Sequence, residues 1–189
     1  MCSAFSKLQS LNRNRMSVEK YEKMITEGTA HLRFCMKLYK MQIENGLYFV
    51  HEHPDGAKSW DDPVVRKLVE DWRVWKVKGD MCQYGMQQED KEGIGSVKKR
   101  TVFITNAEKI AERLDRKCDS KHRHIHLLNG KAKVAEVYPN ELCKEIIRGL
   151  KDQMHLDGRL QDTSVGCVFS MVEGETEWIF YDDVSGEIL

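Results

Sequence analysis

Tyr48-Phe49-Val50-His51-Glu52-His53-Pro54 decides how this sequence is interpreted, because a strand pattern runs directly into groups able to transfer protons. The apolar residues at its start favour a β-strand, and Pro54 ends the run. In open α/β sheets, ligands collect at the carboxyl ends of the strands. We therefore expect Glu52 to be a functional carboxylate at the edge of a parallel sheet. The alternative is a strand end at which Glu52 and the two histidines only face water.

The segments around this stretch predict helices that alternate with strands. Ser17 is a good N-cap, and apolar residues spaced about 3.6 apart then predict a long helix that ends near Gly46. Residues 101–105 have the best strand propensity, and their fully apolar centre indicates burial on both faces. Further helices are expected at 64–72, at 107–114 after an Asn106 cap, and at 139–154; further strands are expected at 73–77, 166–172 and 177–181. Residues 86–96 are expected to be a polar loop and Asn129-Gly130 a turn.

Length and composition are those of a globular protein. With 189 residues, 41% hydrophobic and 32% charged, the chain suits one domain with a real core. We expect this α/β domain to span 1–160, and 161–189 to form an acidic tail or linker with two strands. No apolar run approaches the ~20 residues that span a bilayer, and no secretory signal is visible. We therefore expect an intracellular protein, nuclear or cytoplasmic, without a membrane partner, whose six scattered cysteines are reduced.

Charge is distributed unevenly, although the formal net charge is zero. The middle of the chain is basic at Lys98-Lys99-Arg100 and over 109–123, whereas 161–189 holds seven acidic residues and no Lys or Arg. A basic middle allows contacts with phosphates, so Lys98, Lys99 and Arg100 are the predicted nucleic-acid-binding residues. The alternative is a solvated face followed by a solvated tail.

A cluster of cysteine and histidine offers metal ligands. Cys118, His122, His124 and His126 lie within nine residues, and Cys143 or Cys82 could approach them in the fold. On a strand, His124 and His126 would point the same way, which is a usable geometry for zinc. The alternative is a basic loop whose histidines are solvated or face phosphate.

Several short motifs occur in the order and rough spacing of a known family. They are Cys2-x-x-Phe5-Ser6, Phe49-x-x-Glu52, Asp80-x-x-x-Tyr84-Gly85 and Lys99-Arg100-x-Val102-Phe103-Ile104. Over roughly residues 2–105 the chain resembles the C-terminal part of the catalytic domain of DNA (cytosine-5)-methyltransferases. It departs from that family at Met1, where the family has Pro, at His53-Pro54, where it has Asn-Val, and in the basic run, which lacks the family's Gln.

The resemblance implies an incomplete class I methyltransferase sheet of Rossmann-like type. Cys2 would add to cytosine C6, and Glu52 would hold or protonate ring nitrogen N3 of a base flipped out of DNA. The Phe-x-Gly-x-Gly loop of the S-adenosylmethionine site lies upstream of the cysteine loop in the family and is not in this chain. The resemblance therefore implies a fragment inactive alone, which needs an upstream polyprotein segment for the cofactor site.

The end of the chain has a second, shorter resemblance. Residues 181–189 look like a segment found ahead of reverse transcriptase in polyproteins of Copia-type retroelements. This suggests, as an alternative to methyl transfer, a non-catalytic nucleic-acid-binding or structural segment of such a polyprotein. A third hypothesis is a stand-alone zinc-binding interaction module.

Overall fold

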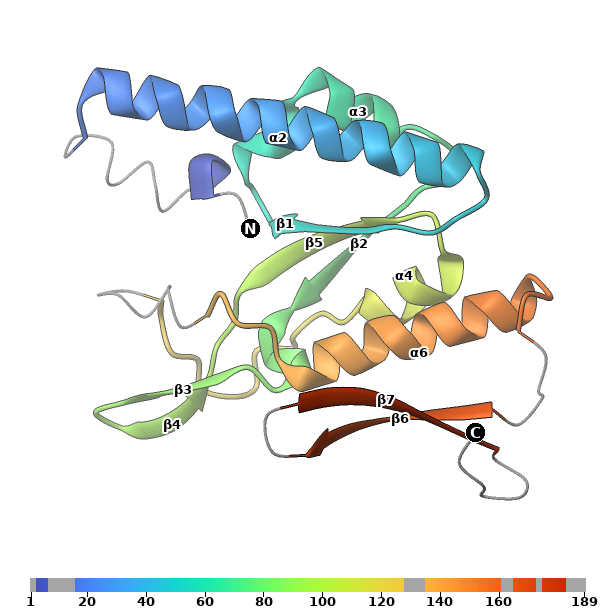
Figure 1. The fold of residues 1–189 in the computed structure, drawn as a ribbon. Helices are drawn as coiled ribbons and strands as arrows, with labels where there is room; N and C mark the ends of the chain where they lie inside the picture. Colours follow the sequence, from blue (N-terminus) through green and yellow to red (C-terminus); the bar gives the residue numbers. More distant parts are fainter. Residues whose placement is uncertain (1–2, 7–15, 128–134, 161–164, 173–174, 183–189) are drawn as a thin grey trace. The chain divides into compact units, whose positions relative to one another are not determined.

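The computed structural model describes residues 3–6, 16–127, 135–160, 165–172 and 175–182 (Figure 1). The chain divides into two compact units, Met1–Gln153 and Met154–Leu189. Cys2 and the turn predicted at Asn129-Gly130 lie outside the described residues.

The first unit is built on a three-stranded sheet in the order β1-β5-β2. Its strands are β1 (Val50–Pro54), β2 (Trp75–Asp80) and β5 (Arg100–Thr105). The central strand β5 runs antiparallel to both neighbours, with Phe103 opposite Glu52 on one side and opposite Val77 on the other. The fold is therefore mixed α/β, as predicted, but the predicted parallel sheet is wrong.

Burial of β5 explains why the strand was predicted correctly and why the sheet was wrongly predicted to be parallel. Five of its six residues are buried, as the apolar run at 101–105 predicts. Burial on both faces is typical of parallel strands, but it also arises when a central antiparallel strand is covered by helices on each side. The apolar pattern indicates that both faces of the strand are buried, but it does not indicate whether the neighbouring strands run parallel or antiparallel to it.

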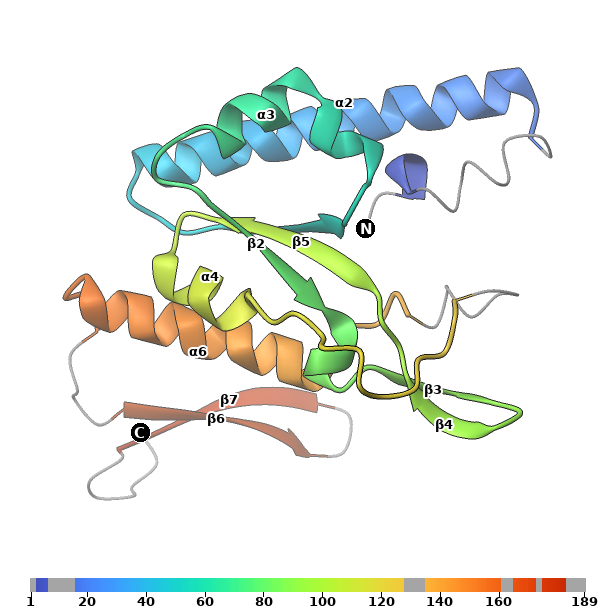
Figure 2. The same ribbon diagram turned by 180° about the vertical axis from the view of Figure 1, so that it is seen from behind.

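Helices cover both faces of this sheet (Figures 1 and 2). On one face lie α2 (Val18–Glu44) and α3 (Pro63–Val69), and on the other lie α4 (Glu108–Leu114) and α6 (Asn140–Leu156). Each layer has its own apolar core. Leu32, Met36 and Ile104 belong to the first, and Phe103 and Leu142 to the second.

Side-chain hydrogen bonds cap the starts of α2 and α3. The Ser17 hydroxyl accepts a hydrogen bond from the Lys20 backbone N–H at 3.3 Å, as expected of an N-cap. At α3, the Asp62 carboxylate accepts from the Val64 N–H at 2.8 Å, and Pro63 occupies the first turn.

The predicted Asn106 cap is wrong, because the side chain of Asn106 has another role. It accepts a hydrogen bond from the Phe49 N–H at 3.0 Å and donates to the Leu47 carbonyl at 2.8 Å. The N-cap of α4 is Ala107, whose N–H donates to the Thr105 hydroxyl at 3.1 Å. Asn106 thus fixes the entry to β1 against the end of β5.

The predicted polar loop at 86–96 is a hairpin instead. Its strands are β3 (Gln87–Asp90) and β4 (Gly93–Ser96), joined through Gly93 at φ 93°. Each strand is only four residues long; β3 is wholly polar, and β4 has one large apolar side chain, that of Ile94. These strands therefore have no hydrophobic period from which the hairpin could be predicted.

The second unit contains another hairpin. Its strands, β6 (Val165–Val172) and β7 (Glu175–Asp182), pair antiparallel with Val165 opposite Asp182. Strands are thus present where the sequence predicts them, at 166–172 and 177–181. The division after Gln153 falls a few residues before the predicted boundary at 160.

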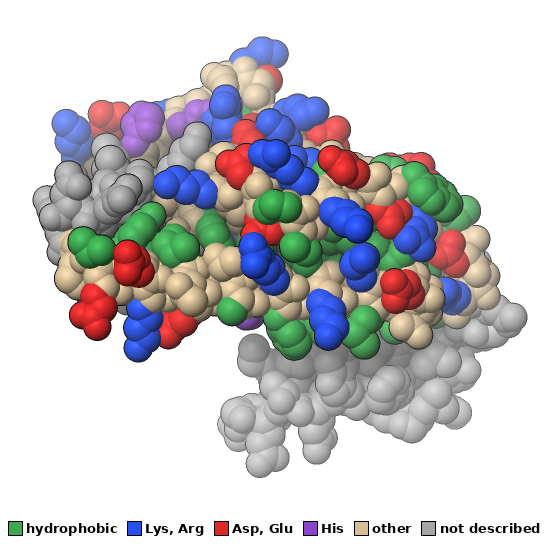
Figure 3. All heavy atoms as spheres, turned by 90° about the horizontal axis from the view of Figure 1, so that it is seen from above, with side chains coloured by type: hydrophobic (Ala, Val, Ile, Leu, Met, Phe, Trp, Pro, Cys, Tyr) green, Lys and Arg blue, Asp and Glu red, His purple; other side chains and the backbone are tan. Residues whose placement is uncertain are grey.

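The surface over α2 carries charges of both signs (Figure 3). Basic and acidic side chains are interspersed on this face, with apolar side chains between them. Phe34, Leu38 and Met41 of α2 are among the exposed large hydrophobic residues. Mixed charge on this face agrees with a net charge of zero for the whole chain.

Glu145 of α6 is a buried carboxylate surrounded by arginines. Arg113 and Arg116 approach it at 3.0 and 2.9 Å, and Arg148 also binds it, while only 3% of its side chain is exposed. Burial acts to raise the pKa of Glu145, but the hydrogen bonds from Arg148 and Arg113 and the charge of Arg116 hold it at about 2. The ion cluster therefore joins α4 to α6 in the ionised state of this carboxyl.

This cluster predicts a loss of stability in acid. Because the pKa of Glu145 is lower in the folded chain than its ordinary 4.5, its contribution is full above that value and is lost as the pH falls towards 2. Urea unfolding at pH 7, 5 and 3 measures this loss. In Glu145→Gln the stability should fall less between pH 5 and pH 3 than in the wild type. An identical acid dependence in both proteins would contradict the assignment.

Candidate metal centre

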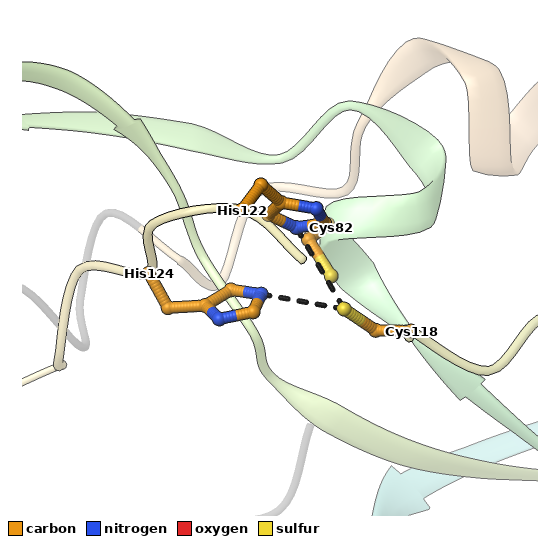
Figure 4. A group of neighbouring side chains, drawn as sticks. All are labelled: Cys82, Cys118, His122 and His124. Carbon is orange, nitrogen blue, oxygen red and sulfur yellow. Dashed lines mark hydrogen bonds between the residues drawn. The ribbon is translucent and has the colours of Figure 1, made fainter. Parts of the chain in front are cut away.

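Four side chains with metal-binding atoms converge beside the end of β2 (Figure 4). They are Cys82, Cys118, His122 and His124, and their ligand atoms all lie within 4.8 Å of one another. Three of the four residues are partly buried, and His122 is exposed. Two sulfurs and two imidazole nitrogens are thus gathered from segments 36 residues apart in the sequence.

Cys82 is held by the short 3-10 helix η4 (Met81–Tyr84), which follows β2 directly. Met81 and Tyr84 are 0% and 1% exposed, and the Tyr84 hydroxyl donates to the Leu114 carbonyl at 2.9 Å. Gly85 then turns the chain at φ 81°, a conformation that favours glycine. Cys82 is therefore fixed between two buried anchors and a tight turn.

Cys118 is held by the end of β2. The buried Asp80 carboxylate accepts a hydrogen bond from the Cys118 N–H at 2.8 Å. The Asp80 backbone N–H in turn donates to the Arg116 carbonyl at 2.9 Å. These two bonds fasten the segment after α4 to the residue that precedes η4, so Cys118 comes to lie opposite Cys82.

The two histidines follow a reversal of the chain at Ser120, whose φ is 62°. His124 then forms a parallel bridge with Ser96, and the Ile125 N–H donates to the Ser96 carbonyl at 2.8 Å. Ile125 is 5% exposed and belongs to the core under η4. The β3–β4 hairpin and this buried isoleucine thus direct His124 back towards Cys118.

The spacing of the ligand atoms fits a tetrahedral ion. For Zn–S of about 2.3 Å and Zn–N of about 2.0 Å, tetrahedral geometry separates sulfur from nitrogen by about 3.5 Å. The Cys118 Sγ lies 3.7 Å from His122 Nε2 and 3.4 Å from His124 Nε2. The cluster therefore needs little rearrangement to hold one ion.

The protonation of the cluster also suits a metal. The pKa of Cys118 is lowered: burial acts to raise it, but the Ser120 backbone N–H, the Cys82 thiol and Lys98 favour the thiolate. Burial and a hydrogen bond with Cys118 raise the pKa of Cys82 to about 11, so the first proton leaves Cys118. Burial and the neighbouring charge of His122 lower the pKa of His124, which favours the neutral imidazole that binds metals.

The group differs in one member from the four predicted ligands. Cys118, His122 and His124 are in it, and Cys82, which the sequence offers as an approaching cysteine, is the fourth. His126 is exposed and lies outside the group. Cys143 is exposed on α6 and also lies outside the group.

Glu52 lies in the middle of β1 and not at the carboxyl end of a parallel strand. Its Oε2 accepts a hydrogen bond from the Tyr138 hydroxyl at 2.8 Å, and Lys99 Nζ lies 3.8 Å from its Oε1. Its side chain is only 9% exposed. Its predicted partner Cys2 lies outside the described residues.

The predicted phosphate-binding run does not form one patch. Lys98 Nζ donates to the Ser120 hydroxyl at 2.7 Å, which places it beside the metal cluster. Lys99 is only 11% exposed and turns towards Glu52, on the other side of the strand. Arg100 is 69% exposed and lies 4.0 Å from Asp80. Alternation along the extended chain separates Lys99 from its two neighbours.

Comparison with known proteins found no matching family model, no similar curated protein and no similar solved structure. Within the described ranges, no helix is both long and apolar enough to cross a membrane.

Proposed function

We propose that this chain is a zinc-binding module, in which one Zn²⁺ ion joins η4 to the loop after α4. The observation that carries the proposal is the convergence of Cys82, Cys118, His122 and His124 within 4.8 Å. A tetrahedral set of two sulfurs and two imidazoles favours zinc over magnesium, calcium or manganese, which prefer oxygen ligands.

The proposed role of the ion is structural. Four protein ligands complete a tetrahedron and leave no position for a water molecule or substrate, whereas catalytic zinc sites usually have three. The surroundings support this role, because the Ser120 backbone N–H donates to the Cys118 sulfur at 3.2 Å. Such outer bonds orient a ligand and tune its basicity. The ion would fix residues that otherwise have no regular secondary structure between α4 and His124.

Zinc content tests the proposal directly. Untagged protein purified without chelator should contain about one zinc per chain, a stoichiometry measured by plasma mass spectrometry. Cys82→Ser and Cys118→Ser should each lower that ratio at least fivefold. His126→Ala is the matched control, since His126 lies in the same loop but outside the cluster, and it should keep its zinc. A wild-type ratio near zero, or equal loss in His126→Ala, would exclude this site.

Nucleic-acid binding is the second candidate function, and a basic cavity beside Cys118 favours it. The cavity has a volume of about 210 Å³, and its lining includes Lys78, Lys98, Arg100 and Lys117. Two carboxylates, Asp55 and Asp80, also line it, so four cations face two anions. The excess of positive charge supports contact with backbone phosphates.

A double variant tests this second candidate. Lys78→Ala with Lys117→Ala removes two cations that are 56% and 67% exposed, so the change should leave the fold intact. Binding to a labelled DNA duplex and to single-stranded RNA should weaken about tenfold, with a shallower dependence on salt. Lys23→Ala with Lys37→Ala, on exposed positions of α2, is the control. Equal binding by both double variants would remove this cavity from the binding surface.

Methyl transfer to cytosine, with S-adenosylmethionine as cofactor, stays a prediction from the sequence resemblance. So does the origin of the chain as a segment of a Copia-type polyprotein. The geometry around Glu52 supports neither hypothesis, because Lys99 pairs with this carboxylate and the Tyr138 hydroxyl donates a hydrogen bond to it.

A further inference from the structure

A groove follows the outer edge of β1, far along the chain from the metal ligands. Its volume is about 670 Å³, within the range of ordinary binding pockets. Leu32 and Tyr39 of α2 line one side, and Tyr138, Leu142 and Ile146 line the other. Because β1 is the end strand of the order β1-β5-β2, the groove lies between two helical layers and along an edge that no other described strand pairs with.

The backbone of β1 leaves hydrogen-bonding groups at this edge. The Asp55 N–H donates to the Arg100 carbonyl at 3.0 Å, so the odd-numbered residues of this strand direct their backbone groups towards β5. Val50 and Glu52 therefore direct their N–H and C=O groups away from β5, into the groove side. Among the described residues, no backbone partner outside the sheet is recorded for them. The Pro54 carbonyl differs, because Trp60 Nε1 donates to it at 2.9 Å.

A buried histidine in the groove wall also has a polar atom without a hydrogen-bond partner. Within the described part of the chain, His51 Nε2 has no hydrogen-bond partner, whereas Glu52 Oε1, which also lacks one, lies 3.8 Å from Lys99 Nζ in an ion pair. His51 is 8% exposed and the Glu52 side chain 9%. Burial and the nearby His53 lower the pKa of His51 to about 3, so its ring is neutral at pH 7. Consecutive residues of a strand face opposite sides, so His51 faces the side of α2 and Glu52 faces the side of α6.

We propose that this groove binds an extended peptide, which adds to the sheet as a strand beside β1. A short peptide segment supplies the N–H and C=O groups that complement Val50 and Glu52, as in other cases of strand addition. Three consecutive peptide residues span this edge. The outer two direct their side chains to the side of Leu142 and Ile146, and the middle one to the side of Tyr39 and His51.

The lining defines the chemistry of the peptide. The side facing α6 is lined by Tyr138, Leu142 and Ile146, and the Glu52 carboxylate on this side is already bound by Tyr138 and Lys99, so the outer two peptide residues are apolar. The middle residue carries a hydrogen-bonding group for His51 Nε2. Glu27 and Glu52 both line the groove, but Lys23 lies 3.9 Å from the first and Lys99 3.8 Å from the second. The groove is therefore close to neutral and favours an uncharged apolar–polar–apolar segment.

Selection from a random decapeptide library displayed on phage tests the proposal with full-length protein. Enriched peptides should share the apolar–polar–apolar pattern. Methylating the backbone nitrogens of those residues in a synthetic peptide should weaken binding at least tenfold, because it removes the pairing N–H groups and keeps the side chains. The affinity is measured by fluorescence anisotropy.

A matched pair of variants locates the binding. His31 is exposed and lines the groove, so His31→Trp should obstruct it and weaken binding at least tenfold. Lys37→Trp adds the same side chain at an exposed position of α2 outside the groove and should change binding less than twofold. Absence of enriched peptides, indifference to N-methylation, or equal affinity of the two variants would overturn the proposal. A concentration-dependent dimer that His31→Trp abolishes would also overturn it, in favour of β1 from a second copy.

Discussion

Replacing Cys118 by Ser is expected to destabilise the first unit by about 4 kcal/mol and to lower its melting temperature by roughly 8–16 °C. The free energy of zinc binding in an isolated zinc finger is about 10 kcal/mol or more, and it drives the folding of that finger. The first unit of this chain, in contrast, also has apolar cores of its own. The loss is therefore partial and falls on the segment that the ion would fix. Thermal unfolding followed by circular dichroism measures it.

Treatment with EDTA distinguishes the loss of stability that comes from losing the ion from any loss caused by the Cys118 substitution itself. Wild-type protein treated with EDTA should melt close to Cys118→Ser, and EDTA should leave the variant unchanged, since both states lack the ion. Cys143→Ser, which removes an exposed cysteine outside the cluster, should melt like the wild type. If EDTA leaves the wild-type melting temperature unchanged, the ion does not stabilise the fold.

Gly149→Leu in α6 is expected to destabilise the first unit by about 3 kcal/mol. A Cβ at Gly149 would lie 2.7 Å from Ile110 Cα and 3.0 Å from the Lys109 carbonyl oxygen, both in the backbone of α4. A backbone atom cannot swing aside as a long side chain can. The two helices would have to separate, although leucine itself favours a helix by about 1 kcal/mol over glycine.

Lys151→Leu on the same helix is the control for this prediction. Lys151 is exposed, so the same new side chain meets solvent and not α4. Urea unfolding should place Lys151→Leu within about 0.5 kcal/mol of the wild type. Equal stability of the two leucine variants would mean that α4 and α6 do not pack through Gly149.

Much of the secondary structure of the first unit follows from the sequence, because local chemistry determines it. Ser17 caps α2, Pro63 begins α3, and the apolar run at 101–105 becomes the buried strand β5. The direction of the strands could not be predicted from the sequence, since a central strand covered on both faces has the same composition in parallel and antiparallel sheets. The hairpin at 87–96 could not be predicted either, because β3 has four polar residues and β4 has one large apolar residue, Ile94, so neither strand has a hydrophobic period.

The metal cluster shows where sequence reasoning ends. Cys118, His122 and His124 stand close together in the sequence, so their convergence is local and predictable. Cys82 joins them only because Asp80 fastens the end of β2 to the segment of Cys118. Its one local signal is the turn at Gly85, which follows the cysteine by three residues. His126 has a similar local spacing and was a reasonable fourth ligand, but it is exposed and lies outside the group.

X-ray absorption at the zinc edge tests the central claim most directly. The spectrum of the purified protein should fit two sulfur neighbours at about 2.3 Å and two nitrogen neighbours at about 2.0 Å. In Cys82→Ser loaded with zinc, one sulfur should be missing. A first shell of oxygen and nitrogen atoms without sulfur would contradict the proposed centre.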